Sequence, residues 1–330
     1  MGNSFTWKKI IFYVFLVFLA LYPLLHGNDY LMHIFNMFFF WAVVATNWNL
    51  IAGYSGTLSL GNVAFFALGG YISGMLAKYF GWSPWLCILI GGLGSTGIVF
   101  LLVGLPSLRL SGIYIALWSL MFAMVLPTLL SIFQDITGGI RGLSEIPPLF
   151  EGITPIISYY INFSLFFVVL IIVYKTIHSS NGLAFMALRD SRDFARALGI
   201  NELKEKLKVF ALTSFLTGIA GGVYVHHLGD ISPALLGITP FLMGLAMVML
   251  GGLGRFPGAI IGAFIITGAS EYFRLAGTWR LSIIGALMCV IILFFPGGIM
   301  EFIDLLDEKF VKIRRRAVNH RSSPENTSQI

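Results

Sequence analysis

Charged side chains and cysteines are scarce in this chain. Asp, Glu, Lys and Arg make up 11% of its 330 residues, against 57% hydrophobic residues and a mean hydropathy of +0.87. Soluble proteins carry about 25% charged residues, so this composition excludes a water-soluble fold and predicts an integral membrane protein. Cys87 and Cys289 both lie inside apolar runs. We therefore expect two small core residues and no disulfide.

Motifs for catalysis and nucleotide binding are missing as well. The sequence contains no G-x-x-x-x-G-K-[ST] phosphate loop, so this chain is not expected to hydrolyse ATP. Glu271 is an exception to the near absence of acids from the apolar segments, and it can pair with Arg274 at i, i+3. Four histidines have no metal-ligand spacing to acids or cysteines: His178, His226, His227 and His320. We expect no enzyme, no metal and no cofactor on this chain.

Long apolar runs dominate what is present. Because a transmembrane helix needs about 20 apolar residues, we predict an all-α, polytopic helical bundle of about ten transmembrane helices over residues 1–313. Two short segments separated only by GLGRFP can instead form a re-entrant hairpin, which would leave about eight spans. The tail 314–330 is polar and predicted to be disordered. The ten segments are 9–25, 31–52, 58–80, 85–105, 112–133, 156–177, 208–228, 238–252, 257–273 and 281–297.

The basic residues predict which ends of these segments face the cytoplasm. Lys8 and Lys9 precede the first segment, Arg109 lies between the fourth and the fifth, and the arginines of KIRRR follow the last. Cytoplasmic loops carry the excess of Lys and Arg. The loop QDITGGIRGLSEIPPLFEGITP, with three acids and one arginine, is expected on the opposite side. Both termini are therefore predicted to be cytoplasmic.

The longest polar stretch inside the apolar region is residues 178–208. It is predicted to be a cytoplasmic, helical element, which Ser180 or Asn181 can cap and Gly199 can end. Asp190 interrupts its apolar face, so the stretch can also form two short helices. Either a membrane-surface helix or a docking site for another protein explains this pattern. On a single helix, one face would carry Leu183, Ala187, Phe194 and Leu198, and the opposite face Arg189, Arg192 and Arg196.

A second polar stretch, NWNLIAGYSGTLSLGN at residues 47–62, lies between two apolar segments and contains the glycines of a Gly53–Gly56 break. Its polar side chains are unsuited to face lipid. They favour two interpretations equally, which are hydrogen bonding between helices and the lining of a translocation path. Those side chains are Asn47, Asn49, Ser55, Thr57, Ser59 and Asn62. The chain's 37 glycines otherwise indicate close helix packing.

Five blocks in order resemble the permease subunits of branched-chain amino acid ABC importers, over about residues 40–300. The blocks are NLIAGYSGTLSLGNVAFFALGGY, LRLSGIYIALWSLMFA, TGGIRGLSEIP, GLAFMALRDSRDFARALGIN and GLAMVMLGGLGRFPGAIIGAF. The TGG block is similar to the longer of the two permease subtypes. This resemblance implies a prokaryotic plasma-membrane complex in which the chain pairs with a second, related permease, two cytosolic ATPase subunits that bind ATP and Mg, and an extracytoplasmic binding protein.

The resemblance also implies roles for residues. A cytoplasmic coupling loop would cover about residues 178–207, with segment 182–199 seated in a cleft of an ATPase subunit. Its coupling residues would be Ala187, Arg189, Asp190, Arg192, Arg196 and Gly199. The substrate path would include Asn47, Asn49, Ser59, Asn62 and Tyr114.

None of these residues identifies the substrate. Leucine, isoleucine and valine are the family's expected substrates, and the same family includes permeases for urea, short amides and other small organic acids. The mechanism expected for an importer is alternating access, driven through the coupling loop. The alternative is an energy-independent channel for a small neutral solute, with the 47–62 stretch as its filter.

Overall fold

The computed structural model describes residues 4–25, 27–150, 152 and 154–277, and only scattered positions between 278 and 301. Most of the predicted segment 281–297 and the whole tail 314–330 lie outside the described residues, as do the side chains of Lys8 and Lys9. The described part is helical, with no strand and one isolated antiparallel bridge between Leu143 and Ile231. The prediction of an all-α fold is confirmed.

Six helical runs in the described part are long and apolar enough to cross a membrane, and each coincides with a predicted segment. They are α2 (Asp29–Trp48) with the π-helical turn Asn49–Tyr54, α3 (Asn62–Phe80), α4 (Pro84–Val99) continued to Ser107, α6 (Ile113–Ile132), α8 (Pro155–Ile177) and α11 (Glu202–Leu228). Shorter apolar helices occur in α1 (Ser4–Leu25), α12 (Ile238–Gly251) and α13 (Gly258–Tyr272).

Two helix starts differ from their predicted positions. α11 begins at Glu202 rather than near residue 208, because Lys206 Nζ lies 2.7 Å from Glu202 Oε1 and the pair brings two charges into the helix together. α3 begins at Asn62 rather than at residue 58. The seven residues before it, 55–61, are not helical. Gly56 there has a φ of +64°, a conformation that favours glycine and ends the preceding helical turn.

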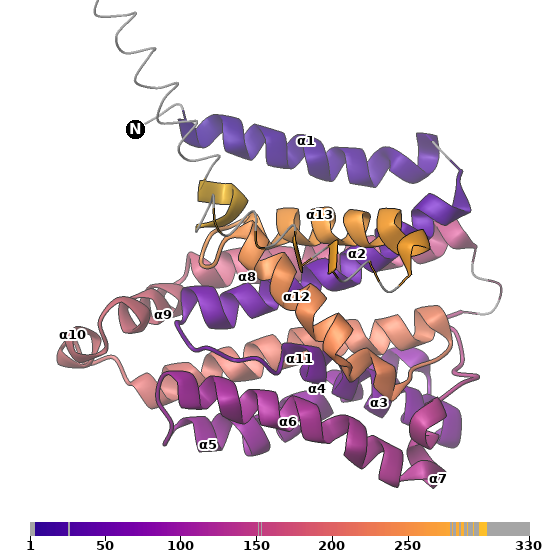
Figure 1. Cartoon of the computed structure of the whole chain (residues 1–330), viewed down its shortest axis with the longest axis horizontal. Helices are drawn as coiled ribbons and strands as arrows, with labels where there is room; N and C mark the ends of the chain where they lie inside the picture. Colours follow the sequence, from indigo (N-terminus) through magenta and orange to yellow (C-terminus); the bar gives the residue numbers. More distant parts are fainter. Residues whose placement is uncertain are drawn as a thin grey trace, which may run out of the picture.

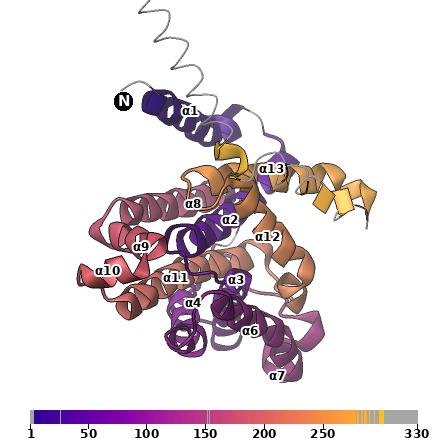
Figure 2. The same ribbon diagram turned by 60° about the vertical axis from the view of Figure 1, so that its left-hand side comes forward.

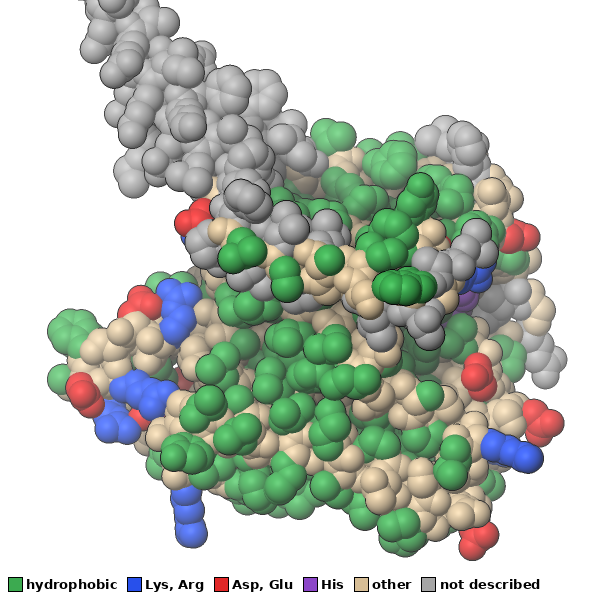
Figure 3. All heavy atoms as spheres, viewed as in Figure 1, with side chains coloured by type: hydrophobic (Ala, Val, Ile, Leu, Met, Phe, Trp, Pro, Cys, Tyr) green, Lys and Arg blue, Asp and Glu red, His purple; other side chains and the backbone are tan. Residues whose placement is uncertain are grey.

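The helices lie side by side and define two ends of the molecule (Figure 1). α9 (Ser180–Asp190) and α10 (Arg192–Ala197) project at one end, which we call the α9–α10 end, and α7 (Gln134–Thr137) lies at the other. The view turned by 60° keeps this arrangement (Figure 2). Lys and Arg side chains gather at the α9–α10 end, and a mainly apolar band separates the two ends (Figure 3). This is the surface that a bilayer requires.

Glycines bring α3, α4 and α11 into close contact at the centre of the bundle. A Cβ atom on Gly69 of α3 would lie 2.1 Å from the carbonyl oxygen of Gly218 in α11. A Cβ atom on Gly221 of α11 would lie 1.9 Å from the carbonyl oxygen of Phe66. Neither distance leaves room for a side chain, so here the prediction of glycine-mediated helix packing is confirmed.

α12 and α13 form a hairpin against α2. At 1.5 Å per residue, each helix is about 21–23 Å long, shorter than the hydrocarbon core of about 30 Å. The turn between them, residues 252–257, reaches the α9–α10 end, where Gly254 contacts Gly53. At the other end of α13, Arg274 Nε lies 3.0 Å from Glu271 Oε1, and Tyr30 donates a hydrogen bond to the same carboxylate. The predicted Glu271–Arg274 ion pair is confirmed.

The two cysteines differ in burial. Cys87 is buried, as predicted, but Cys289 is exposed, so the prediction of a core position was wrong for Cys289. In a bilayer, an apolar side chain on the outside of the bundle faces lipid tails and loses little by doing so. An apolar run therefore does not distinguish core from surface in such a protein.

Candidate functional site

The charged stretch after α8 forms two short helices, α9 and α10, rather than one. The chain breaks at Ser191, whose backbone is extended (φ −157°, ψ 109°) and whose hydroxyl accepts a hydrogen bond from Phe194 N at 3.4 Å to cap α10. α9 is capped by Ser179, so the expectation of Ser180 or Asn181 was wrong, because the helix already begins at Ser180. Gly199, with a φ of +82°, follows the end of α10 as predicted.

Three large apolar side chains of this element point outward. Leu183, Phe194 and Leu198 are 64–65% exposed at the α9–α10 end. Phe185 and Leu188 are buried instead and attach α9 to the bundle. Exposed apolar side chains at a charged end of a membrane protein are typical of a contact with another protein or with the membrane surface.

Arg189 joins α9 to the end of α2. Its Nη1 donates a hydrogen bond to the carbonyl oxygen of Gly53 at 3.0 Å, and its Nε contacts Asp190 Oδ1 at 2.9 Å. Gly53 lies in the π-helical turn that follows α2. A Cβ atom on Gly56 would lie 2.8 Å from Arg189 Cγ. Arg189 therefore points back into the bundle, whereas the carboxylate-bearing side chain of Asp190 is 67% exposed.

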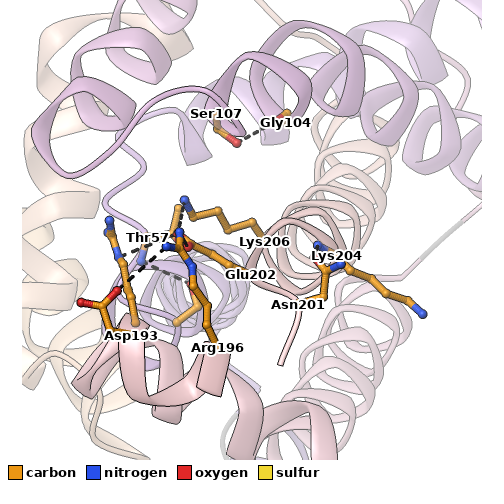
Figure 4. Close-up of polar contacts among 11 residues, drawn as sticks. Thr57, Gly104, Ser107, Asp193, Arg196, Asn201, Glu202, Lys204 and Lys206 are labelled. Atoms are coloured by element: carbon orange, nitrogen blue, oxygen red, sulfur yellow. Dashed lines mark hydrogen bonds and ion pairs between the residues drawn. The ribbon is translucent and has the colours of Figure 1, made fainter. Parts of the chain in front are cut away.

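Glu202 joins α10 to α11 (Figure 4). Its carboxylate, 7% exposed, pairs with Arg196 of α10 and with Lys206 of α11, the latter at 2.7 Å. Arg192 Nε lies 3.8 Å from the same carboxylate. Lys206 is also buried, so neither charge is compensated by solvent. The arginines predicted to lie on one exposed face thus have partners within the chain, and α9–α10 is attached to the bundle at two points.

All four polar residues predicted for the substrate path between α2 and α3 are buried: Asn47, Asn49, Ser59 and Asn62. The non-helical segment 55–61 connects these helices, and side chains supply part of its hydrogen bonding. Trp48 Nε1 donates to Ser59 O at 2.7 Å, and Ser119 of α6 accepts from Leu60 N at 2.8 Å. Such non-helical backbone inside a membrane protein is stable only where the protein or water satisfies its polar groups.

The asparagines of this region differ in their partners. Asn49 Oδ1 accepts from Gly254 N at 2.7 Å and its Nδ2 donates to Arg255 O at 3.1 Å, so Asn49 links α2 to the α12–α13 turn. Asn47 Oδ1, and both side-chain polar atoms of Asn62, have no hydrogen-bond partner in the described part of the structure. Asn49 therefore matches the first interpretation, hydrogen bonding between helices. Asn47 and Asn62 keep side-chain polar atoms that can still form a hydrogen bond, as a residue lining a substrate path needs.

Tyr114 does not join these buried residues. It lies near the start of α6 and is 62% exposed. Its place on the path stays a prediction.

A group of histidines was missed by sequence reasoning. His33 of α2 and His226 and His227 of α11 line one cavity at the end of the bundle opposite α9 and α10. His33 is nearly two hundred positions from His226 and His227 in sequence, so no spacing rule could predict that the three lie together. The signal was a polar face at the start of α2, where Asp29, His33 and Asn36 follow at helical intervals. Among the described residues, no group of three or more His, Cys, Asp or Glu could hold a metal ion.

Comparisons with known proteins agree with this architecture. Residues 30–295 match the family described as "Branched-chain amino acid transport system / permease component". The chain is 28% identical over 323 residues to the high-affinity branched-chain amino acid transport system permease protein LivM of Escherichia coli (strain K12), covering 89% of this chain and 76% of that one.

Two further relatives extend this comparison. LivM of Salmonella typhimurium is 27% identical over 320 residues, covering 89% of this chain and 75% of that one. The permease protein LivH of Escherichia coli (strain K12) is 24% identical over 285 residues, covering 79% and 91%. No solved structure matches the chain. With six membrane-length helices in the part of the chain that the structure describes, and a family match over most of its length, the chain belongs to the permease components of branched-chain amino acid transport systems.

Proposed function

We propose that this chain is a membrane-spanning subunit of an ATP-driven importer of branched-chain amino acids. In this proposal it pairs with a second, related permease, as the similarity to both LivM and LivH supports. Two cytosolic ATPase subunits bind ATP and Mg, and an extracytoplasmic binding protein delivers leucine, isoleucine or valine. The assembly lies in the plasma membrane of a prokaryote, with about ten spans in this chain and both termini cytoplasmic.

The observation that carries this proposal is the structure of α9–α10. It offers exposed Leu183, Phe194 and Leu198 to a partner at the end of the molecule where basic side chains gather. The same element is attached to α2 through Arg189 and to α11 through Glu202. A passive channel has no need for an element that both docks and is anchored in this way.

The proposed mechanism follows from those two attachments. ATP closes the ATPase dimer, and α9–α10 moves with the cleft in which it sits. Arg189 passes this displacement to Gly53 through its hydrogen bond. Asn49, in the same π-helical turn, passes it on to the α12–α13 turn, to which it is hydrogen-bonded. Glu202 passes it to α11. The helices around segment 55–61 then rock between outward and inward arrangements.

Uptake measurements test this proposal. Cells that lack the protein, and the same cells complemented with it, are given radiolabelled leucine, with radiolabelled urea in parallel, before and after ATP depletion. We expect leucine uptake that requires both the protein and ATP. Uptake of urea that requires the protein but not ATP would instead identify a passive channel and contradict the importer.

A further inference from the structure

A cavity of about 510 Å³ opens at the end of the bundle opposite α9 and α10. It lies between the first turns of α2, the loop before α8, the start of α8 and the last turn of α11. Pockets for small molecules typically measure about 300–1,000 Å³. One face of α2 supplies Asp29, Met32, His33 and Asn36 to its wall.

The cavity contains hydrogen-bond acceptors without donors. Asn36 is 3% exposed, and its Oδ1 has no hydrogen-bond partner in the described part of the structure. Asp29, two helical turns earlier on the same face, is exposed at the opening of the cavity, and its carboxylate forms no ion pair with another described residue. A buried acceptor without a donor is unfavourable until a ligand supplies one. An anionic carboxylate at the opening attracts an ammonium group, and the buried amide oxygen of Asn36, about 10 Å further along α2, can accept a hydrogen bond from it.

The cavity also contains donors. Nδ1 of His227 lies 3.4 Å from Asn162 Nδ2 and 2.6 Å from Ser158 Oγ. Because an amide nitrogen only donates, Nδ1 of His227 accepts and the ring proton resides on Nε2. This N–H has no partner among the described residues, and the ring of His33 stacks on the same imidazole, with 6.4 Å between centroids. Two imidazoles with free nitrogens suit a carboxylate.

His226 differs from its neighbour. Its Nδ1 lies 2.6 Å from Pro147 O and its Nε2 lies 3.0 Å from Ser73 Oγ, so both nitrogens have partners within the protein. The remaining wall is mainly apolar, although Thr154 also lines it, and Met32 and Leu149 are both buried. Deeper in the bundle, the buried ring of Phe40 packs on His227, with 5.8 Å between centroids.

We propose that this cavity is a binding site for an apolar α-amino acid. Asn36 accepts a hydrogen bond from its ammonium group, which the exposed carboxylate of Asp29 attracts at the opening. His227 and His33 donate to its carboxylate, and Met32 and Leu149 contact its side chain. This assignment rests on the proposed function and adds to it the place where the permease itself first holds the substrate. The phosphoethanolamine headgroup of a lipid has the same pair of charges, so the experiment includes it as a separate arm.

Protection of an engineered cysteine from a charged maleimide tests the assignment directly in membranes that contain the assembled transporter. The reporter is Pro148→Cys, an exposed position on the cavity wall, in a chain that also carries Cys87→Ala and Cys289→Ala. Leucine at about ten times its dissociation constant should slow labelling about tenfold, as site occupancy dictates. 3-Methylbutylamine, which lacks the carboxylate, and 4-methylpentanoate, which lacks the ammonium group, should protect far less. Asp29→Asn should abolish protection by leucine.

Ser144→Cys is the matched control, because Ser144 is exposed near the same end but does not line the cavity. The rate at which the maleimide labels Ser144→Cys should be the same with and without leucine. If Pro148→Cys does not fold, Phe150→Cys reports from the same wall. Equal labelling with and without leucine, or protection that survives Asp29→Asn, would overturn the assignment. Stronger protection by phosphoethanolamine than by leucine would assign the cavity to lipid instead. If the reporter chain supports leucine uptake in cells but its cysteine shows no protection, only the cavity assignment fails, whereas absence of uptake by the wild-type chain rejects the proposed function itself.

Discussion

Glu202 shows how single side chains hold the charged element to the apolar bundle. Its carboxylate is buried at the first turn of α11 and has three cationic partners, Arg192 and Arg196 on α10 and Lys206 on its own helix. Buried ion pairs contribute little net stability when intact, but removing one partner leaves an uncompensated buried charge. In this cluster Lys206 would be that charge.

Glu202→Gln should therefore destabilise the protein by about 3 kcal/mol, because Lys206 keeps its charge and loses its carboxylate. Thermal unfolding of the detergent-solubilised transporter measures the change. Asp193→Asn is the matched control, since it removes the same charge from a side chain that is 99% exposed and 4.0 Å from the same Arg196. It should leave the unfolding temperature unchanged. Equal unfolding temperatures for both variants would mean that Glu202 does not hold the two helices together.

At the scale of elements, the α9–α10 unit combines two kinds of surface. One consists of buried contacts to the bundle, through Phe185, Leu188, Arg189 and the Glu202 cluster. The other consists of the exposed Leu183, Phe194 and Leu198. The break at Ser191 permits both, because two short helices can orient their apolar residues independently whereas one continuous helix cannot.

Phe194→Asp should leave the chain folded and abolish its association with the ATPase, because it places a charge in the middle of the proposed docking surface. The amount of ATPase subunit that co-purifies with the tagged permease measures this. Leu203→Asp serves as control, because Leu203 is 48% exposed at the same end but lies on α11, where an acid in the first turn is compatible with the helix dipole. Undiminished co-purification with Phe194→Asp would show that the ATPase docks elsewhere.

The whole molecule has two ends of different charge separated by an apolar band (Figure 3). Arg192, Arg196, Lys204 and Arg109 belong to loops or helix starts at the α9–α10 end. The loops at the other end, 134–154 and 229–237, contain more acids than bases. The rule that places basic residues in the cytoplasm then predicts that the α9–α10 end is cytoplasmic.

This orientation predicts which positions an impermeant thiol reagent can reach. In a chain carrying Cys87→Ala and Cys289→Ala, Ser144→Cys should react when the reagent is added to intact cells. The side chain of Leu198 is 64% exposed. Leu198→Cys should react only after the cells are permeabilised. Labelling of Leu198→Cys in intact cells would reverse the orientation and remove α9–α10 from the reach of any cytosolic ATPase.

Much of the candidate coupling element could be read from the sequence, but its internal contacts could not. The alternation of apolar and basic residues predicted a helical, charged element and allowed for a break near Asp190. The contact of Arg189 with Gly53 joins residues 136 positions apart in sequence, and helical periodicity carries no information about such pairs. For the same reason the sequence could not predict the histidine cavity, whose walls come from α2, α8 and α11.

By itself the sequence determined the class of protein, the positions of the six long apolar helices in the described part, and the family. These depend on composition, on apolar runs of fixed minimum length and on local motifs, because the bilayer imposes one requirement on every span. Only the tertiary structure decided which polar residues bond to each other and which remain free. Asn49 forms hydrogen bonds with the α12–α13 turn. Asn36, Asn47 and Asn62 each have side-chain polar atoms without a hydrogen-bond partner in the described part of the structure. The reason is physical: hydrogen bonds depend on distances of about 3 Å between atoms that folding alone brings together.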